Sequence, residues 1–303
     1  MEAYLWESIG DGQVRCSMCN HRCRIKEGKR GLCHVRENTD GRLRSRVYGN
    51  VVARNVDPIE KKPLFHFLPG TYSYSIATVG CNFKCLFCQN ADISQMPNDH
   101  DRIMGQDMTP DRIVDEALNT RSATISYTYT EPTIFFELAV DTARIAVSKG
   151  IKNVFVSNGY MTKQCLEDIF PDLHAANVDL KAFSDKFYKK QCGAKLGPVL
   201  NTLEAMKEMG IWLEITTLLI PGLNDSTEEL NEIARFLAGL DSNIPWHISR
   251  FHPTYHLTHV HSTPPDSIKR ARDLGYKAGL KYVYTGNLPG DVGEKTFCHH
   301  CHE

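Results

Sequence analysis

The sequence lacks both a long apolar run and a marked charge of either sign. No hydrophobic stretch approaches the roughly 18 residues that a membrane-spanning helix needs, so we expect no membrane association. Lys and Arg (35) nearly balance Asp and Glu (36), and the formal net charge is -1. This balance excludes a strongly basic protein that binds nucleic acid or a membrane surface through its overall charge, although it leaves room for a local basic patch.

A secretory signal is missing as well. Residues 1–12, MEAYLWESIGDG, have no basic segment followed by an apolar core. The eleven cysteines are too few for a disulfide scaffold, and most of them are clustered: Cys16, Cys19, Cys23 and Cys33; Cys81, Cys85 and Cys88; Cys298 and Cys301; with Cys165 and Cys192 alone. Without a secretory signal, such clusters indicate metal sites in a reducing compartment, so we expect a cytoplasmic protein.

From about residue 73 the sequence alternates between strand-like and helix-like segments. The expected strands span residues 74–79, 123–127, 153–157, 177–181, 211–220, 246–251 and 281–284. The expected helices span residues 109–120, 133–148, 163–175, 199–209, 226–238 and 264–278, with Thr109 as an N-cap and a capping box near Ser226. Such units with short connections predict an α/β fold with a parallel sheet.

Polar residues follow many of these strands, which favours a barrel or partial barrel over a dinucleotide-binding sheet. They are Asn82, Glu131, Asn158, Lys181 and His252. A barrel places its chemistry at the carboxyl ends of its strands. In addition, no G-x-G-x-x-G motif follows the first strand.

The segment after the first strand carries three cysteines in the spacing C-x3-C-x2-C. It reads Cys81-Asn82-Phe83-Lys84-Cys85-Leu86-Phe87-Cys88. Three thiolates on one loop can hold a [4Fe–4S] cluster by three of its irons, whereas ordinary sites use four cysteines. The fourth iron would then offer the open position that a catalytic metal site needs. The alternative is a zinc site completed by a histidine or a remote cysteine.

This motif, with an aromatic residue before its last cysteine, resembles the hallmark of the radical S-adenosylmethionine (SAM) superfamily. The resemblance covers residues 72–287 and is greatest to pyruvate formate-lyase activating enzymes. It implies a partial (β/α)6 TIM-type barrel, a [4Fe–4S] cluster that binds SAM at its open iron, and a low-potential electron donor. It further implies that SAM is cleaved reductively to a 5′-deoxyadenosyl radical, which abstracts a hydrogen atom from the substrate.

The same resemblance implies a set of SAM contacts. They are Phe87 beside the adenine, Glu131 for the methionine ammonium, Ser157 and Asn158, Asp179 and Lys181, and His252 toward the nucleoside. Tyr129-Thr130 stand where activating enzymes have Gly-Gly, and Thr216 stands where they have an arginine. Three of these contacts have a named alternative: a helix-start acid for Glu131, a plain turn at Asn158 and a structural histidine at His252.

The first cysteine block offers four thiolates within eighteen residues, Cys16-x2-Cys19-x3-Cys23-x9-Cys33, with His21 and His34 adjacent. Four such ligands can close a tetrahedral zinc site or hold a second iron–sulfur cluster, and the spacing does not choose between them. Free reduced cysteines are the remaining alternative. We expect a closed metal centre that does not bind SAM.

Residues 57–70 (DPIEKKPLFHFLPG) and 245–253 (PWHISRFHP) resemble the radical SAM member of the AmmeMemoRadiSam system. This resemblance implies Memo-like and AMMECR1-like proteins as partners. We therefore predict a radical SAM oxidoreductase that acts on a small molecule or a partner protein. The alternatives are a glycyl-radical enzyme activase and a non-enzymatic zinc scaffold.

We expect three regions in the chain. Residues 1–72 form a Cys-rich metal-binding module with a strand extension, residues 73–290 form the barrel, and residues 291–303 form a tail with a C-x2-C motif. The cysteines of that tail, Cys298 and Cys301, could be half a metal site, the stub of a longer tail, or partners for the N-terminal cysteines.

Overall fold

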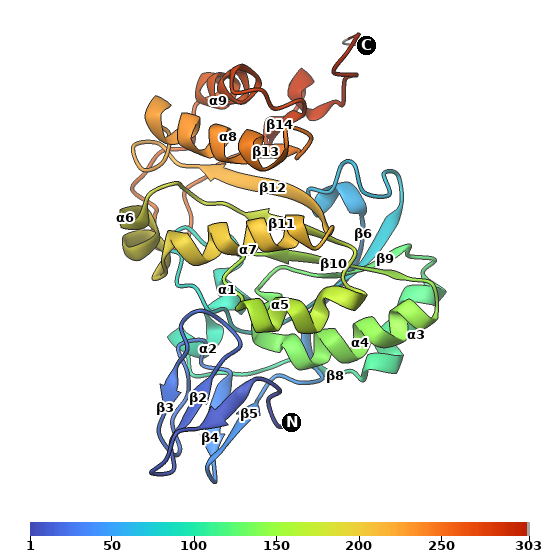
Figure 1. Cartoon of the computed structure of the whole chain (residues 1–303), viewed down its shortest axis with the longest axis vertical. Helices are drawn as coiled ribbons and strands as arrows, with labels where there is room; N and C mark the ends of the chain where they lie inside the picture. Colours follow the sequence, from blue (N-terminus) through green and yellow to red (C-terminus); the bar gives the residue numbers. More distant parts are fainter. Residues whose placement is uncertain (302–303) are drawn as a thin grey trace.

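Seven parallel strands form the centre of the protein in the computed structural model, which describes residues 1–301 (Figure 1). They are β7 (Tyr72–Thr78), β9 (Thr124–Tyr127), β10 (Lys152–Ser157), β11 (Ala175–Asp179), β12 (Trp212–Leu219), β13 (Trp246–Arg250) and β14 (Val283–Gly286). Each strand pairs in parallel with the next along the chain. The strands expected from the sequence are confirmed, and their ends differ by about two residues at most.

Two further strands extend the sheet antiparallel to this set. The long strand β6 (Asn50–Pro58) pairs with β7, and β8 (Gln106–Asp107) pairs with β6. The nine strands run in the order β14-β13-β12-β11-β10-β9-β7-β6-β8, and within residues 1–301 no ladder joins the two edges. The fold is therefore α/β with a partial TIM-type barrel, as expected, and β14 adds a seventh parallel strand to the six of the family pattern.

Helices follow the parallel strands and lie along the outside of the sheet (Figure 1). The longer ones are α3 (Pro110–Asn119), α4 (Phe136–Ser148), α5 (Lys163–Ile169), α7 (Leu196–Glu208), α8 (Thr227–Asp241) and α9 (Pro265–Lys277). Short turns lie in the connections: α1 (Ala91–Ser94), α2 (Met96–Asp99), α6 (Asp185–Phe187), η1 (Ile59–Lys61), η2 (Pro132–Phe135), η3 (Phe170–Asp172), η4 (Tyr188–Cys192) and η5 (Val292–Glu294). Among residues 1–301, no helix combines the length and apolar character needed to span a bilayer.

Helix ends follow the expected local chemistry in most places. The hydroxyl oxygens of Thr109 and Ser226 accept hydrogen bonds from the backbone N–H groups of Arg112 and Glu229. The second half of the capping box is replaced, because the Glu229 carboxylate accepts from the N–H of Phe183 instead. The helix expected over residues 163–175 stops at residue 169 and continues as the turn η3, which contains a proline that has no N–H to donate.

The N-terminal residues form two small sheets at one end of the molecule, opposite the C-terminus (Figure 1). One sheet contains β1 (Trp6–Ser8), β2 (Val14–Cys16) and β3 (Arg24–Ile25), and the other is the hairpin of β4 (Arg36–Thr39) and β5 (Arg42–Ser45). A buried ion pair joins them to the barrel: Arg36 donates to both carboxylate oxygens of Glu137 in α4, at 2.8 Å each. Removing one partner of such a pair would leave an uncompensated buried charge.

The segment between β6 and β7 enters the interior of the barrel. Ile59 and Leu64 pack against the strand residues Val154 and Ala175. The fully buried Glu214 carboxylate accepts the N–H groups of Phe65 and His66 at 2.9 and 2.8 Å. It also bonds to Nε2 of His247 at 2.7 Å. Burial alone would raise the pKa of Glu214, but these hydrogen bonds hold it below its usual value.

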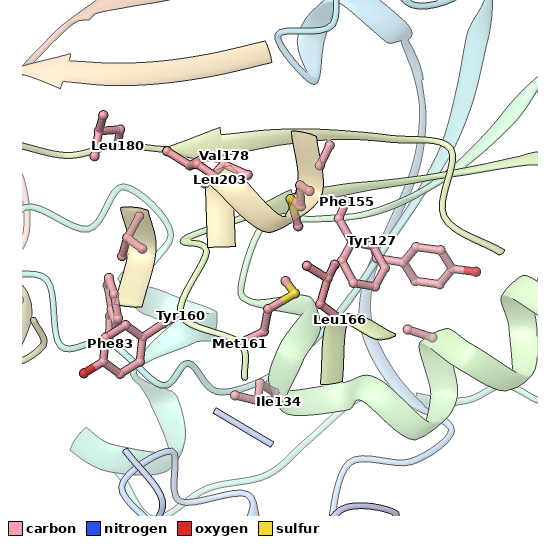
Figure 2. Close-up of a cluster of buried hydrophobic side chains, with 14 of the residues drawn as sticks. Phe83, Tyr127, Ile134, Phe155, Tyr160, Met161, Leu166, Val178, Leu180 and Leu203 are labelled. Atoms are coloured by element: carbon pink, nitrogen blue, oxygen red, sulfur yellow. The ribbon is translucent and has the colours of Figure 1, made fainter. Parts of the chain in front are cut away.

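A continuous apolar core connects the sheet, the helices and the loop that carries the second cysteine group. Figure 2 shows part of it, with strand residues such as Phe155 and Val178 packed beside Leu166 of α5 and Leu203 of α7. Phe83, from the middle of the cysteine loop, is also fully buried there, with its ring centre 5.1 Å from that of Tyr160. The cysteine loop is therefore anchored by its own core residue. The proposed boundary at residue 72 remains a prediction; β6 lies in the barrel sheet, and the expected tail 291–303 ends outside the described residues.

Candidate active site

The carboxyl ends of the barrel strands surround one cavity of about 320 Å³. Nine of the residues expected at the site line it: Cys81, Cys85, Phe87, Cys88, Glu131, Ser157, Asn158, Asp179 and Lys181. His252 is the exception among the barrel residues, because its side chain is exposed and bonds to Ser262 at 3.2 Å. The parallel strands thus bring together side chains that are up to 100 positions apart in the sequence.

The cysteine loop is held in place by the backbone of η4. The N–H of Lys84 donates to the carbonyl oxygen of Cys192 at 2.8 Å, and the N–H of Leu86 donates to that of Gln191 at 2.9 Å. The turn before the loop requires Gly80, which has a φ of +103° and would place a Cβ 2.7 Å from a methyl carbon of Val35. These constraints present the three thiols of the loop to one cavity.

The environment of the thiols differs along the loop. Burial raises the pKa values of Cys81 and Cys88. The pKa of Cys85 is instead lowered, because the thiol of Cys192 hydrogen-bonds to its sulfur. Hydrogen bonds also reach the other two sulfurs: the N–H of Phe83 donates to Cys81 at 3.4 Å, and the hydroxyl of Ser94 lies 3.2 Å from Cys88.

These three sulfurs could each bind a separate iron of one cluster. Within residues 1–301, no group of three or more His, Cys, Asp and Glu side chains is placed to hold a single metal ion. Asn158 adds a further polar contact, since its Nδ2 lies 3.8 Å from Sγ of Cys81 and donates to Oδ1 of Asn82 at 2.7 Å. An anionic cluster bound to the loop would therefore find hydrogen-bond donors already in position.

Glu131 is buried and braces two neighbouring strands. Its Oε1 accepts from Thr133 and from the hydroxyl of Ser157 at 2.9 Å, and its Oε2 accepts from the N–H of Asn158 at 2.8 Å. Burial raises the pKa of Glu131, although these hydrogen bonds oppose the shift. Glu131 also caps η2, so the helix-start alternative is realised, while Oε2 keeps capacity for a further donor.

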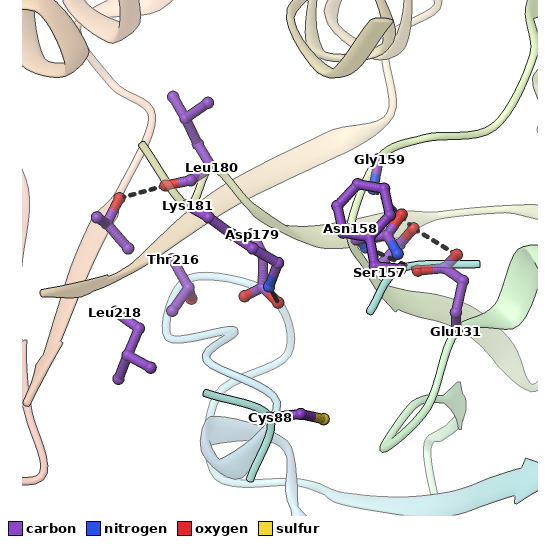
Figure 3. Close-up of polar contacts among 12 residues, drawn as sticks. Cys88, Glu131, Ser157, Asn158, Gly159, Asp179, Leu180, Lys181, Thr216 and Leu218 are labelled. Atoms are coloured by element: carbon purple, nitrogen blue, oxygen red, sulfur yellow. Dashed lines mark hydrogen bonds and ion pairs between the residues drawn. The ribbon is translucent and has the colours of Figure 1, made fainter. Parts of the chain in front are cut away.

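A second charged group lies at the end of β11. Nζ of Lys181 donates to Oδ2 of Asp179 at 2.8 Å and lies 5.9 Å from the centre of the Phe87 ring. Burial opposes the charge of Lys181, but Asp179 and the nearby thiols outweigh it and raise its pKa. Figure 3 shows this pair beside the Glu131–Ser157–Asn158 group, which belongs to the adjacent strands.

Among the further cavity residues, to which the sequence analysis gave no role at the site, are Lys62 and Tyr129. Tyr129 adopts a φ of +61°, a left-handed conformation that glycine adopts without strain, at a position where activating enzymes have a glycine. Its hydroxyl donates to Asp57 at 2.7 Å, and the same carboxylate accepts from Lys62 at 2.8 Å. Two features of the sequence could have indicated that these residues lie at the cavity: the departure from Gly-Gly at residues 129–130 and the charged residues of the segment DPIEKK.

Cys192 is another residue whose position the sequence did not indicate. It is fully buried. Its thiol nevertheless contacts Cys85 of the cysteine loop, as described above. Nothing in the sequence signals this, because 107 positions separate the two residues and the contact depends on how η4 packs.

Comparison with known proteins agrees with this architecture. A model of the radical SAM superfamily matches residues 75–237, which is more than half of the chain. An uncharacterized protein of Methanocaldococcus jannaschii is 48% identical over 99% of this chain and 89% of its own length. The pyruvate formate-lyase-activating enzyme of Clostridium pasteurianum is 21% identical over 53% of this chain and 67% of its own length.

Solved structures also share this fold. Streptococcus suis SuiB bound to S-adenosylmethionine superimposes with a TM-score of 0.56 over 73% of this chain and 52% of that protein, at 15% identity. Membership of this superfamily implies an enzyme that uses a [4Fe–4S] cluster and SAM. The match to the family model and the similarity to a relative of nearly equal length show that the chain belongs to the radical SAM superfamily.

Proposed function

We propose that Cys81, Cys85 and Cys88 hold the catalytic [4Fe–4S] cluster and that the radical is delivered to a small molecule or a partner protein. The observation that carries the proposal is the cavity lined by all three thiols and by the polar ends of β9, β10 and β11. The donor set fits the cofactor, because three thiolates ligate three irons and leave one free. A non-enzymatic zinc scaffold does not agree with membership of an enzyme superfamily.

When bound, the reduced cluster supplies the electron that splits SAM into methionine and a 5′-deoxyadenosyl radical. The chain's own residues bind and orient SAM and keep water away. Oε2 of Glu131 has room to accept the methionine ammonium, in a charge-assisted hydrogen bond. Phe87 is buried beside Lys181 and offers an apolar surface for the adenine. Asn158 holds the loop through Asn82 and Cys81.

Five further cavity residues are assigned to the substrate, because they lie on other elements than the residues assigned to SAM. They are Lys61, Lys62, Thr216, Leu218 and Ser249. Lys62 gives this wall a buried positive charge that Asp57 balances. A wall of this kind, mostly polar with one apolar residue, suits a small polar molecule or one side chain of a partner protein.

The partners follow from the resemblance of residues 57–70 and 245–253 to the AmmeMemoRadiSam member. They are Memo-like and AMMECR1-like proteins, together with a low-potential electron donor. A second candidate is activation of a glycyl-radical enzyme, in which the hydrogen atom is taken from a backbone glycine. The similarity to the Clostridium pasteurianum pyruvate formate-lyase-activating enzyme favours this candidate.

Transfer of deuterium tests these functions together. Anaerobically reconstituted, reduced protein is incubated with SAM and with each deuterated candidate: a Memo-like protein, an AMMECR1-like protein or a glycyl-radical enzyme. Deuterium in the 5′-deoxyadenosine identifies the hydrogen donor, and a glycyl radical detected by electron paramagnetic resonance supports the activase. If no 5′-deoxyadenosine formed with or without partners, the proposed function would be contradicted.

A further inference from the structure

The N-terminal cysteines, which the proposed function does not use, meet at one place in the structure. Cys16 ends β2, Cys19 and Cys23 lie in the connection to β3, and Cys33 precedes β4. All four line a single cavity, together with apolar side chains that include Met18, Ile25 and Ile134. The pairing of β2 with β3 brings the first three together, since the N–H of Cys16 donates to the carbonyl oxygen of Cys23.

The spacing around two of these sulfurs repeats that of the catalytic loop. There, the N–H of Phe83 turns back to Sγ of Cys81, two residues earlier. In the N-terminal block, His21 and Val35 stand in the same position, two residues after Cys19 and Cys33. Amide donors of this kind stabilise a negative charge on sulfur.

Arg36, one of the residues that line this cavity, carries a buried donor without a partner within residues 1–301. Arg36 lines the cavity and is only 2% exposed, and its two terminal nitrogens are bonded to Glu137. Its Nε is buried and has no hydrogen-bond partner within the described residues. Four thiolates around a divalent metal carry a net negative charge, so a bound centre would supply the acceptor that this N–H lacks.

The neighbouring histidines are not needed as ligands. His21 Nε2 bonds to the carbonyl oxygen of Asn82 at 2.8 Å, and its ring packs against Tyr160. His34 is not among the residues that line the cavity. The four sulfurs are as many as a closed cluster needs, one for each iron, and within residues 1–301 no three of them are placed around a single metal ion.

The cavity lies directly behind the catalytic loop. Asn82 lines it, and on its other side the same residue bonds to Asn158 in the active site. The backbone of Cys33 passes close to the residue before the loop, since its carbonyl oxygen would lie 3.3 Å from a Cβ added at Gly80. A centre in this position would fix the surface on which the catalytic loop rests.

We infer that Cys16, Cys19, Cys23 and Cys33 bind one closed, four-thiolate metal centre that orders the N-terminal strands and supports the catalytic loop. Those strands have two to four residues each and pack into the common core through buried residues such as Val14, Ile25 and Leu43, and the metal links the connections between them. Zinc and a second iron–sulfur cluster share this thiolate chemistry, and the cluster suits the structure better, because within residues 1–301 no three of these side chains surround one metal ion. The inference does not rest on the proposed function.

Metal analysis of a Cys81→Ala/Cys85→Ala/Cys88→Ala variant tests the inference and distinguishes the two metals. We expect about one zinc or about four irons per chain in the purified, folded variant. Adding Cys19→Ala and Cys33→Ala should remove that metal. Adding Cys165→Ala should not, although this buried thiol lies 3.4 Å from the sulfur of Met18 beside the cavity. Adding Cys298→Ala and Cys301→Ala, at the far end of the chain, should not remove it either.

A folded triple variant that contains neither zinc nor iron would overturn the inference. If the triple variant does not fold, the metal content of the unaltered protein decides. Zinc or iron that Cys19→Ala/Cys33→Ala removes from the otherwise unaltered protein supports the second centre. A metal content that this pair of substitutions leaves unchanged would overturn it. Loss of SAM cleavage alone has no bearing on this result, which keeps it separate from the proposed function.

Discussion

The ammonium group of Lys62 lies 4.5 Å from the centre of the Tyr129 ring. Both side chains also bond to the carboxylate of Asp57, so the three form one polar cluster on the cavity wall. This cluster ties the segment that enters the barrel to the left-handed residue after β9. It explains how a tyrosine can occupy a backbone conformation that favours glycine: its hydroxyl and its ring are both held by partners.

The first prediction concerns Asp57 and pH. Burial alone would raise the pKa of Asp57, but the hydrogen bonds from Lys62 and Tyr129 outweigh it and lower the pKa from 3.8 to about 2. A lowered pKa contributes stability above pH 3.8 that is lost as the pH falls toward about 2. We therefore expect Asp57→Asn to reduce the free energy of unfolding by about 2 kcal/mol at neutral pH.

Denaturant unfolding at neutral pH and at about pH 3 measures this difference. The gap between the unaltered protein and Asp57→Asn should narrow at the lower pH. Asp115→Asn, at an exposed position of α3, is the matched control and should change little at either pH. A gap of the same size at both pH values would mean that the Asp57 carboxylate does not stabilise the fold through its charge.

The second prediction concerns Glu131. Replacing it by glutamine keeps its size but removes the charge that would attract the methionine ammonium, an interaction typically worth about 1.5–3 kcal/mol. We expect Glu131→Gln to weaken SAM binding about tenfold or more, with iron content unchanged. Equilibrium binding under anaerobic conditions measures this, with the exposed Glu167→Gln of α5 as the control. Unchanged affinity would remove Glu131 from the SAM site.

The third prediction concerns Cys192, whose thiol hydrogen-bonds to Cys85. Hydrogen bonds to cluster sulfurs favour the reduced state, so their loss lowers the reduction potential. A thiol is a weak donor, and we expect Cys192→Ala to lower the potential by roughly 30 mV, about half of a tenfold change in a one-electron equilibrium. Redox titration followed by electron paramagnetic resonance measures the shift. The control is Cys165→Ala, which removes another fully buried thiol and should leave the potential unchanged. Equal potentials in the unaltered protein and both variants would show that Cys192 does not hydrogen-bond to Cys85.

Local patterns were sufficient to predict the barrel, because alternating apolar strands and capped helices are encoded within short windows of sequence. The ends of β7 and β11 differ from expectation by only about two residues. The loop of Cys81 was identifiable for the same reason, since its three ligands lie within eight residues. Its placement after the first parallel strand then followed from the fold.

Contacts between distant segments could not be predicted. Lys62 reaches the cavity because the residues around it pack on the inner face of β10 and β11, and no local pattern encodes that path. Cys192 approaches Cys85 through backbone hydrogen bonds between two irregular segments. His252 is a residue for which a local motif was not sufficient. Its motif resembles that of activating enzymes, yet its side chain is exposed beside Ser262. The contact of His252 with the nucleoside stays a prediction.

Reductive cleavage of SAM by a variant of the cysteine loop tests the central claim most directly. Reconstituted, reduced protein and its Cys85→Ala variant are incubated with SAM, and 5′-deoxyadenosine is quantified, with Cys165→Ala as the control. Because Cys85 is the most buried thiol of the loop and would hold one of three liganded irons, we expect its loss to abolish 5′-deoxyadenosine formation while the control retains it. Formation of 5′-deoxyadenosine by Cys85→Ala at the rate of the unaltered protein would contradict the account.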